Sequence, residues 1–162
     1  MSRSGSFGIN YKKSYGSTPS IPEAKVGDLG TDIHGEWMYV QASAAVNQYD
    51  FVLISSTFTA APLTTTNAGS AAQYIGVAQY ALANGEYGWV WIGGAAGGGV
   101  GVGIKGNVAA AVTSGGKLYT HATAGTVSNT ATVQVTNVST TASTAAAGSV
   151  ELRSFGYFGV NI

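Results

Sequence analysis

Short runs of β-branched and aromatic residues, separated by Gly, Asn and Ser, recur along the chain from Trp37 onward. Residues of these types are enriched in strands, and the interruptions are typical of tight turns. The runs follow one another at roughly ten-residue intervals, and about eight or more such strands predict an all-β sandwich or barrel. The expected strands are Trp37–Ala42, Phe51–Ile54, Gln73–Tyr80, Tyr87–Ile92, Val100–Ile104, Asn107–Val112, Lys117–Thr120, Val133–Val138 and Val150–Val160, with a shorter one at Val127.

Two pairs of these strands are expected to be neighbours. Trp37–Ala42 and Phe51–Ile54 are separated by the polar turn Asn47–Asp50, which predicts a hairpin or adjacent strands. Gln73–Tyr80 leads through an Asn-Gly pair into Tyr87–Ile92, and Asn-Gly is a strong turn signal. We therefore expect the second two strands to pair.

The run Tyr87–Ile92 is apolar on both faces. Because side chains alternate across a strand, Tyr87, Trp89 and Trp91 share one face, while the other carries glycine and aliphatic residues. Such a strand is either central to a core, or core on one face and interface on the other, with indole rings as anchors. Both interpretations, core and self-association, stay open for these three aromatic residues.

The first 36 residues differ in composition from the rest. They hold eight of the fourteen charged residues and two of the three prolines, without apolar periodicity. We interpret residues 1–36 as an extended N-terminal arm that precedes an all-β domain at residues 37–162. An apolar series at mostly two-residue spacing suits an extended segment lying on a partner, whereas the composition is also typical of a disordered tail. The candidate partner-contact residues are Phe7, Ile9, Tyr11, Lys12, Lys13 and Tyr15.

Charge is scarce in the domain. Between Phe51 and Val150 only Glu86, Lys105 and Lys117 are charged, whereas about a quarter of residues are charged in ordinary soluble domains. The 7 basic and 7 acidic residues of the whole chain balance, so no attraction to nucleic acid or to a membrane surface is indicated. The uncharged stretch around residues 93–103 is too rich in glycine to form a good membrane helix.

Motifs that would carry chemistry are weak. The glycines at 101, 103 and 106 match a dinucleotide fingerprint by letters, but no acidic residue follows at the required distance. Asp32, His34 and Glu36 alternate along an extended segment, which suits either a divalent-ion site or a solvated hinge between arm and domain. His121 has no neighbouring carboxylate to orient it for hydrolysis. We therefore expect no enzyme, with no catalytic residue, no cofactor and no metal.

The order of four segments resembles the decoration, or cement, proteins of tailed-bacteriophage heads. These segments are Ala45–Val52, Ile75–Ala78, Gly85–Gly93 and Gly116–Gly125, so the resemblance covers about residues 42–127. It implies a small β-barrel or β-tulip domain, often trimeric, bound outside an icosahedral shell and stabilising it by bridging neighbouring capsomers. The implied partners are the major capsid protein and further copies of the chain, with a trimer favoured. The implied location is the outer capsid surface of the virion, after assembly in the host cytoplasm.

The arm of 36 residues and the Thr/Ala-rich stretch Ser139–Ala147 depart from the shortest members of that family. An alternative hypothesis is a head-fibre or adhesin module that recognises host surface glycan through exposed aromatic residues. Solvent-facing Trp89 and Trp91 would favour glycan binding, and burial at a protein interface would favour the decoration protein.

Overall fold

The chain folds almost entirely into β-structure, as the sequence predicts. The computed structural model describes residues 9–17, 24–69, 74–94, 100–130 and 132–161. Within these ranges it has one short helix, α1 (Thr65–Ala68), and eleven strands. The strands are β1 (Leu29–Asp32), β2 (Gly35–Ala42), β3 (Phe51–Ile54), β4 (Thr59–Pro62), β5 (Tyr74–Ala78), β6 (Tyr87–Gly93), β7 (Val100–Val108), β8 (Lys117–Thr120), β9 (Val127–Ser128), β10 (Gln134–Thr140) and β11 (Gly148–Asn161).

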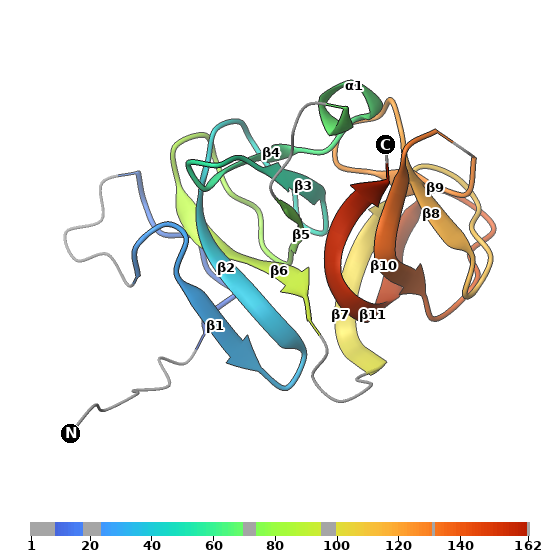
Figure 1. The fold of residues 1–162 in the computed structure, drawn as a ribbon, viewed down its shortest axis with the longest axis horizontal. Helices are drawn as coiled ribbons and strands as arrows, with labels where there is room; N and C mark the ends of the chain where they lie inside the picture. The colour runs from blue at the N-terminus through green and yellow to red at the C-terminus, as the bar shows by residue number, and fades with distance from the viewer. Residues whose placement is uncertain (1–8, 18–23, 70–73, 95–99, 131, 162) are drawn as a thin grey trace.

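Ten of these strands form two barrels of the same topology, which lie side by side (Figure 1). The first barrel has the order β2-β4-β3-β5-β6 and closes where β6 pairs with β2. The second has the order β7-β9-β8-β10-β11 and closes where β11 pairs with β7. In each barrel the first and third strands along the chain pair in parallel, and the other pairs are antiparallel. The chain therefore contains one five-stranded arrangement twice.

One of the two expected strand pairings is wrong and the other is confirmed. β2 and β3 are not neighbours, because β4 lies between them. The turn between β2 and β3 instead contacts the turn between β5 and β6. There the N–H of Val46 donates to the carbonyl of Leu82 and the N–H of Leu82 donates to the carbonyl of Val46, both at 2.9 Å. The expected pairing of β5 with β6 is present, with Val77 opposite Trp91.

The same contact between turns recurs in the second barrel, where Val112 of the β7–β8 turn pairs with Thr144 of the β10–β11 turn. We call these four turns, two in each barrel, the crossing turns. Three of the four contain a residue with positive φ: Tyr49 at 69°, Gly85 at 85° and Gly115 at 71°. The N–H of each of these residues donates to the carbonyl that ends the facing strand, at 2.7, 2.7 and 2.9 Å respectively. The turns thus hold the barrel ends together in pairs.

A carboxylate closes two of these turns. Asp50 Oδ2 accepts the backbone N–H of Asn47 at 2.8 Å, and Glu86 Oε2 accepts that of Ala83 at 2.9 Å. The equivalent position in the second barrel is Gly116, which has no side chain. There Asn129 supplies the acceptor for the N–H of Thr113, at 2.8 Å.

The two faces of β2 and β6 have different surroundings. One buried cluster draws aliphatic residues from all five strands of the first barrel, including Val40 and Val90, and forms its interior. The residues that alternate with these point outward, and Trp37, Tyr39, Trp89 and Trp91 form what we call the aromatic face. The aromatic face is nevertheless buried, because the N-terminal segment and the second barrel cover it. It is a contact between parts of one chain.

Candidate binding surfaces

Residues 9–17 of the arm lie on the aromatic face. Ile9, Tyr11 and Tyr15 pack against the buried cluster. The ring of Tyr11 stacks on Trp37 with 4.4 Å between centroids and 11° between planes. The backbones of Tyr15 and Tyr87 exchange two hydrogen bonds, of 2.7 and 2.8 Å. The apolar series of the arm is thus engaged by the chain's own barrel.

The described residues that were predicted to contact a partner are therefore of two kinds: the apolar ones are partly buried against the chain's own barrel, and the lysines are exposed. Phe7 lies outside the described residues. Lys12 and Lys13 are exposed, with their ammonium groups 5.7 Å and 4.8 Å from the ring centroids of Tyr11 and Tyr15. Among the described residues of the arm, these two lysines present charge to solvent beside the aromatic face. Their contact with a partner stays a prediction.

The aromatic residues singled out on β6 are largely inside the molecule. Trp91 is 0% exposed and Trp89 is 5% exposed, while Tyr87 is half-buried against the same cluster. The Trp91 ring meets Phe158 of the second barrel edge to face, at 4.8 Å between centroids. Since neither indole faces solvent, neither can form a platform for a glycan.

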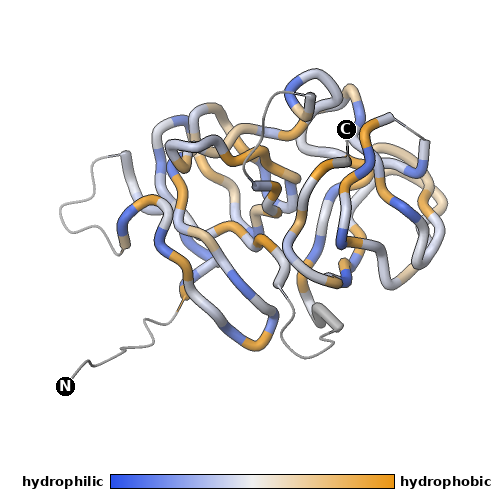
Figure 2. Tube along the Cα trace, viewed as in Figure 1, coloured by the Kyte–Doolittle hydropathy of each residue, from blue (hydrophilic) through white to orange (hydrophobic). Residues whose placement is uncertain are grey.

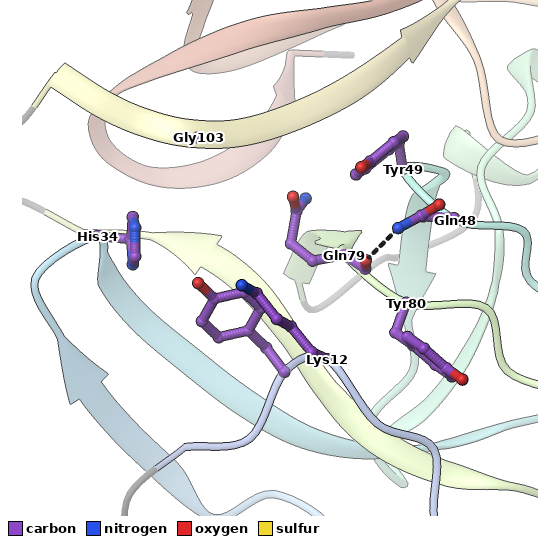
Figure 3. Close-up of a pocket in the computed structure, with 8 residues that line it drawn as sticks. Lys12, His34, Gln48, Tyr49, Gln79, Tyr80 and Gly103 are labelled. Carbon is purple, nitrogen blue, oxygen red and sulfur yellow. Dashed lines mark hydrogen bonds between the residues drawn. The ribbon is translucent and has the colours of Figure 1, made fainter.

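A cleft of about 500 Å³ opens beside the arm, where the first barrel faces β7 (Figure 3). Sequence reasoning did not find this cleft, because its walls come from five separate segments of the chain. The arm, the β1–β2 turn, two crossing turns and β7 each contribute. The lining residues are Tyr11, Lys12, His34, Gln48, Tyr49, Gln79, Tyr80 and Gly103.

Hydrogen bonds fix the inner wall of the cleft. The side-chain amide of Gln79 donates to the carbonyl of Lys105 at 2.8 Å and accepts the N–H of Lys105 at 3.1 Å. Gln48 Nε2 donates to the carbonyl of Gln79 at 3.2 Å, as the dashed line in Figure 3 marks. These bonds tie the two barrels together at the cleft and hold both glutamines in place.

A buried carboxylate adds a further hydrogen bond between the two barrels, outside the cleft. Asp50 is 2% exposed, and its Oδ1 accepts a hydrogen bond from Asn107 Nδ2 of β7 at 3.0 Å. Its Oδ2 also accepts from the side chain of Asn47, at 3.1 Å. The Asp50 carboxylate therefore joins a turn of the first barrel to the first strand of the second.

We expect Asp50→Ala to lower the free energy of unfolding by about 2 to 3 kcal/mol, because it removes a buried carboxylate that accepts two hydrogen bonds from Asn47 and one from Asn107. Urea denaturation followed by far-UV circular dichroism measures this loss. The matched control is Glu86→Ala, which removes the equivalent turn carboxylate where it is less buried, with an expected loss of about 1 kcal/mol or less. Equal losses in the two variants would contradict the linking role of Asp50.

The residues considered for a metal site diverge. Asp32 accepts hydrogen bonds from Trp37 Nε1 and the backbone of His34, both at 2.8 Å, and its other oxygen lies 2.9 Å from His34 Nδ1. Glu36 instead accepts a hydrogen bond from Tyr157 Oη at 2.6 Å. Within the described ranges, no three His, Cys, Asp or Glu side chains come together in a way that could hold a metal ion.

Large apolar side chains are exposed near the place where β11 meets the end of β6. Phe155 is 61% exposed, Tyr157 is 51% exposed and Tyr74 is 38% exposed; we call these three the junction patch. The hydrogen bond to Glu36 raises the pKa of Tyr157 above its ordinary value, and Tyr74 is close enough to contribute. Ile33, at 87% exposure, occupies the neighbouring β1–β2 turn, whose tip is coloured hydrophobic in Figure 2.

Comparison of the chain with protein-family models, with curated proteins and with solved structures found no match. Among the described residues, no helix has the length and apolar character needed to cross a membrane. The fold and the surfaces described above are accordingly the basis for the functional argument.

Proposed function

We propose that this chain is a decoration protein of a tailed-bacteriophage head, which binds the outer surface of the shell and bridges neighbouring capsomers. The observation that carries the proposal is the junction patch, because clustered exposed aromatic side chains are typical anchors of protein interfaces. The resemblance over residues 42–127 supplies the class of partner, the major capsid protein. Stabilisation then follows from many modest contacts that must be released together.

The arm adds a second point of attachment in this proposal. Its apolar residues are held by the aromatic face, so the exposed Lys12 and Lys13 are the groups that it offers to the shell or to a neighbouring copy. Self-association, with a trimer favoured, places several junction patches on one particle. Light scattering of the purified chain after size exclusion measures its oligomeric state.

Co-sedimentation of the purified chain with undecorated heads of its cognate phage tests the proposal. We expect the unmodified chain to bind, and the double variant Phe155→Ser, Tyr157→Ser to bind about tenfold more weakly or worse. Tyr80→Ser is the matched control, because Tyr80 is also exposed but lies in the cleft, and it should bind normally. If the unmodified chain fails to sediment with heads, the proposed function is wrong.

A chain that lacks residues 1–17 tests the arm in the same assay. This deletion keeps β1, which belongs to the sheet, and removes Lys12 and Lys13. If the deletion variant binds heads as well as the full chain does, the arm does not contribute to attachment, and the junction patch is the attachment surface.

A further inference from the structure

We propose that the cleft between the arm, the first barrel and β7 is a binding site for an acidic saccharide. This site is separate from the junction patch and does not depend on attachment to a capsid. Its volume of about 500 Å³ is ample for a short oligosaccharide. Small-molecule sites commonly occupy about 300 to 1,000 Å³.

The lining residues have the chemistry that sugars require. Three tyrosine rings, from Tyr11, Tyr49 and Tyr80, supply flat apolar surfaces on which the C–H face of a pyranose can pack. The amide of Gln48 and the imidazole of His34 add polar groups among these rings, while both atoms of the Gln79 amide are bonded to Lys105. None of the described residues that line the cleft is aliphatic, so the site does not suit a purely apolar ligand.

The charge beside the cleft favours an acidic sugar over a neutral one. Lys12 lines the cleft and is exposed, and Lys105 Nζ lies 5.8 Å from the centroid of the Tyr49 ring. No carboxylate is among the described lining residues: Asp32 is hydrogen-bonded to His34 and Trp37, Asp50 to Asn47 and Asn107, and Glu151 lies opposite Lys105 on β11. Lys12 is the one charged side chain among the described lining residues, so a sugar carboxylate entering here meets an ammonium group.

The backbone around the cleft argues against a peptide as the ligand. Extended peptides gain much of their affinity by pairing with a free strand edge. Here the N–H and C=O of Lys105 are both bonded to the Gln79 side chain, and the carbonyl of Gln79 is bonded to Gln48. These same bonds hold the glutamines before any ligand arrives, which lowers the ordering cost of binding.

Titration of the full chain with two acidic probes, α-1,4-linked trigalacturonate and N-acetylneuraminic acid, tests the proposal by NMR and calorimetry. We expect saturable binding of at least one probe, with affinity about fivefold lower in Lys12→Gln. In Tyr80→Ser the affinity should be about tenfold lower, because a stacking ring is lost. Lys117→Gln and Tyr157→Ser change an exposed lysine and an exposed tyrosine outside the cleft, and they should bind like the unmodified chain.

The fully methyl-esterified trigalacturonate is the matched neutral probe. It should bind more weakly than the acid, because Lys12 recognises the carboxylates. The proposal is overturned if neither acidic probe saturates in the millimolar range, if the ester binds as tightly as the acid, or if a hexaglutamate peptide binds more tightly than both acidic probes. Because the double variant Phe155→Ser, Tyr157→Ser tests head binding and Tyr80→Ser tests saccharide binding, failure of one hypothesis is distinguishable from failure of the other.

Discussion

Replacing Gly125 with alanine should lower the free energy of unfolding by about 3 to 5 kcal/mol, through combined steric overlap and backbone strain. Gly125 has φ +76°, and a Cβ there would overlap the Asp50 carboxylate, 2.5 Å from Oδ1. The carboxylate cannot move away easily, because Asn47 and Asn107 hold it. The backbone of Gly125 is also fixed, since it accepts from Phe51 and donates to Leu63, both at 2.8 Å. Urea denaturation measures the loss.

Gly115→Ala separates the two contributions to this loss. Gly115 has a similar φ of +71°, but a Cβ built there meets no atom within 4 Å. Only the strain of a left-handed alanine then remains, so the loss should be about 1 kcal/mol. If both variants lose the same free energy, the contact between Gly125 and Asp50 does not constrain the fold as described.

Trp91→Ala is the second change for which we expect a large loss, of about 3 to 5 kcal/mol. The side chain is 0% exposed and packs against Phe158, so its removal leaves a cavity between the two barrels. It also leaves the carbonyl of His34 without the hydrogen bond that Trp91 Nε1 donates at 2.9 Å. Far-UV circular dichroism in urea gives the loss of stability, and amide hydrogen exchange reports whether the strands of both barrels lose protection.

Two further variants control for the identity of the side chain. Trp91→Phe keeps much of the packing but not the hydrogen bond, so its loss should fall between zero and that of the alanine variant. Phe155→Ala removes a ring that is 61% exposed and should change stability by about 0.5 kcal/mol or less. A similar loss for Phe155→Ala and Trp91→Ala would contradict the assignment of Trp91 to the contact between barrels.

Local sequence signals are sufficient to predict most strands but not their partners. β-branched and aromatic runs identify most strands, β2, β3, β5 and β6 among them, because these preferences act within a few residues. The expectation of two strands at Val100–Ile104 and Asn107–Val112 is wrong, since β7 is one strand that ends at Val108. The turn at Asn47–Asp50 looks like a hairpin locally, yet its crossing depends on Leu82, which lies far along the chain. β1 and β4 were missed: β1 is a short edge strand within the charged arm, and β4 is an alanine-rich segment that ends in proline.

The internal repetition left a faint trace in the sequence. Ala45-Val46, Ala81-Leu82 and Ala111-Val112 each precede a turn by the same spacing, and each apolar residue forms the cross-turn bridge. A pattern of only two residues per turn, one small and one apolar, is too short to indicate a repeat from the sequence. The cleft could not be predicted at all, because its lining residues meet only after both barrels and the arm are in place.

The repeated topology lets equivalent positions in the two halves be compared. Tyr39 faces Trp89 across the closing strands of the first barrel, and at the same register of the second barrel Lys105 faces Glu151. The aromatic pair lies where other parts of the chain cover the strands, whereas Glu151 is exposed to solvent. The two halves thus keep one backbone hydrogen-bond pattern, while at these equivalent positions the amino acids follow the surroundings of each barrel.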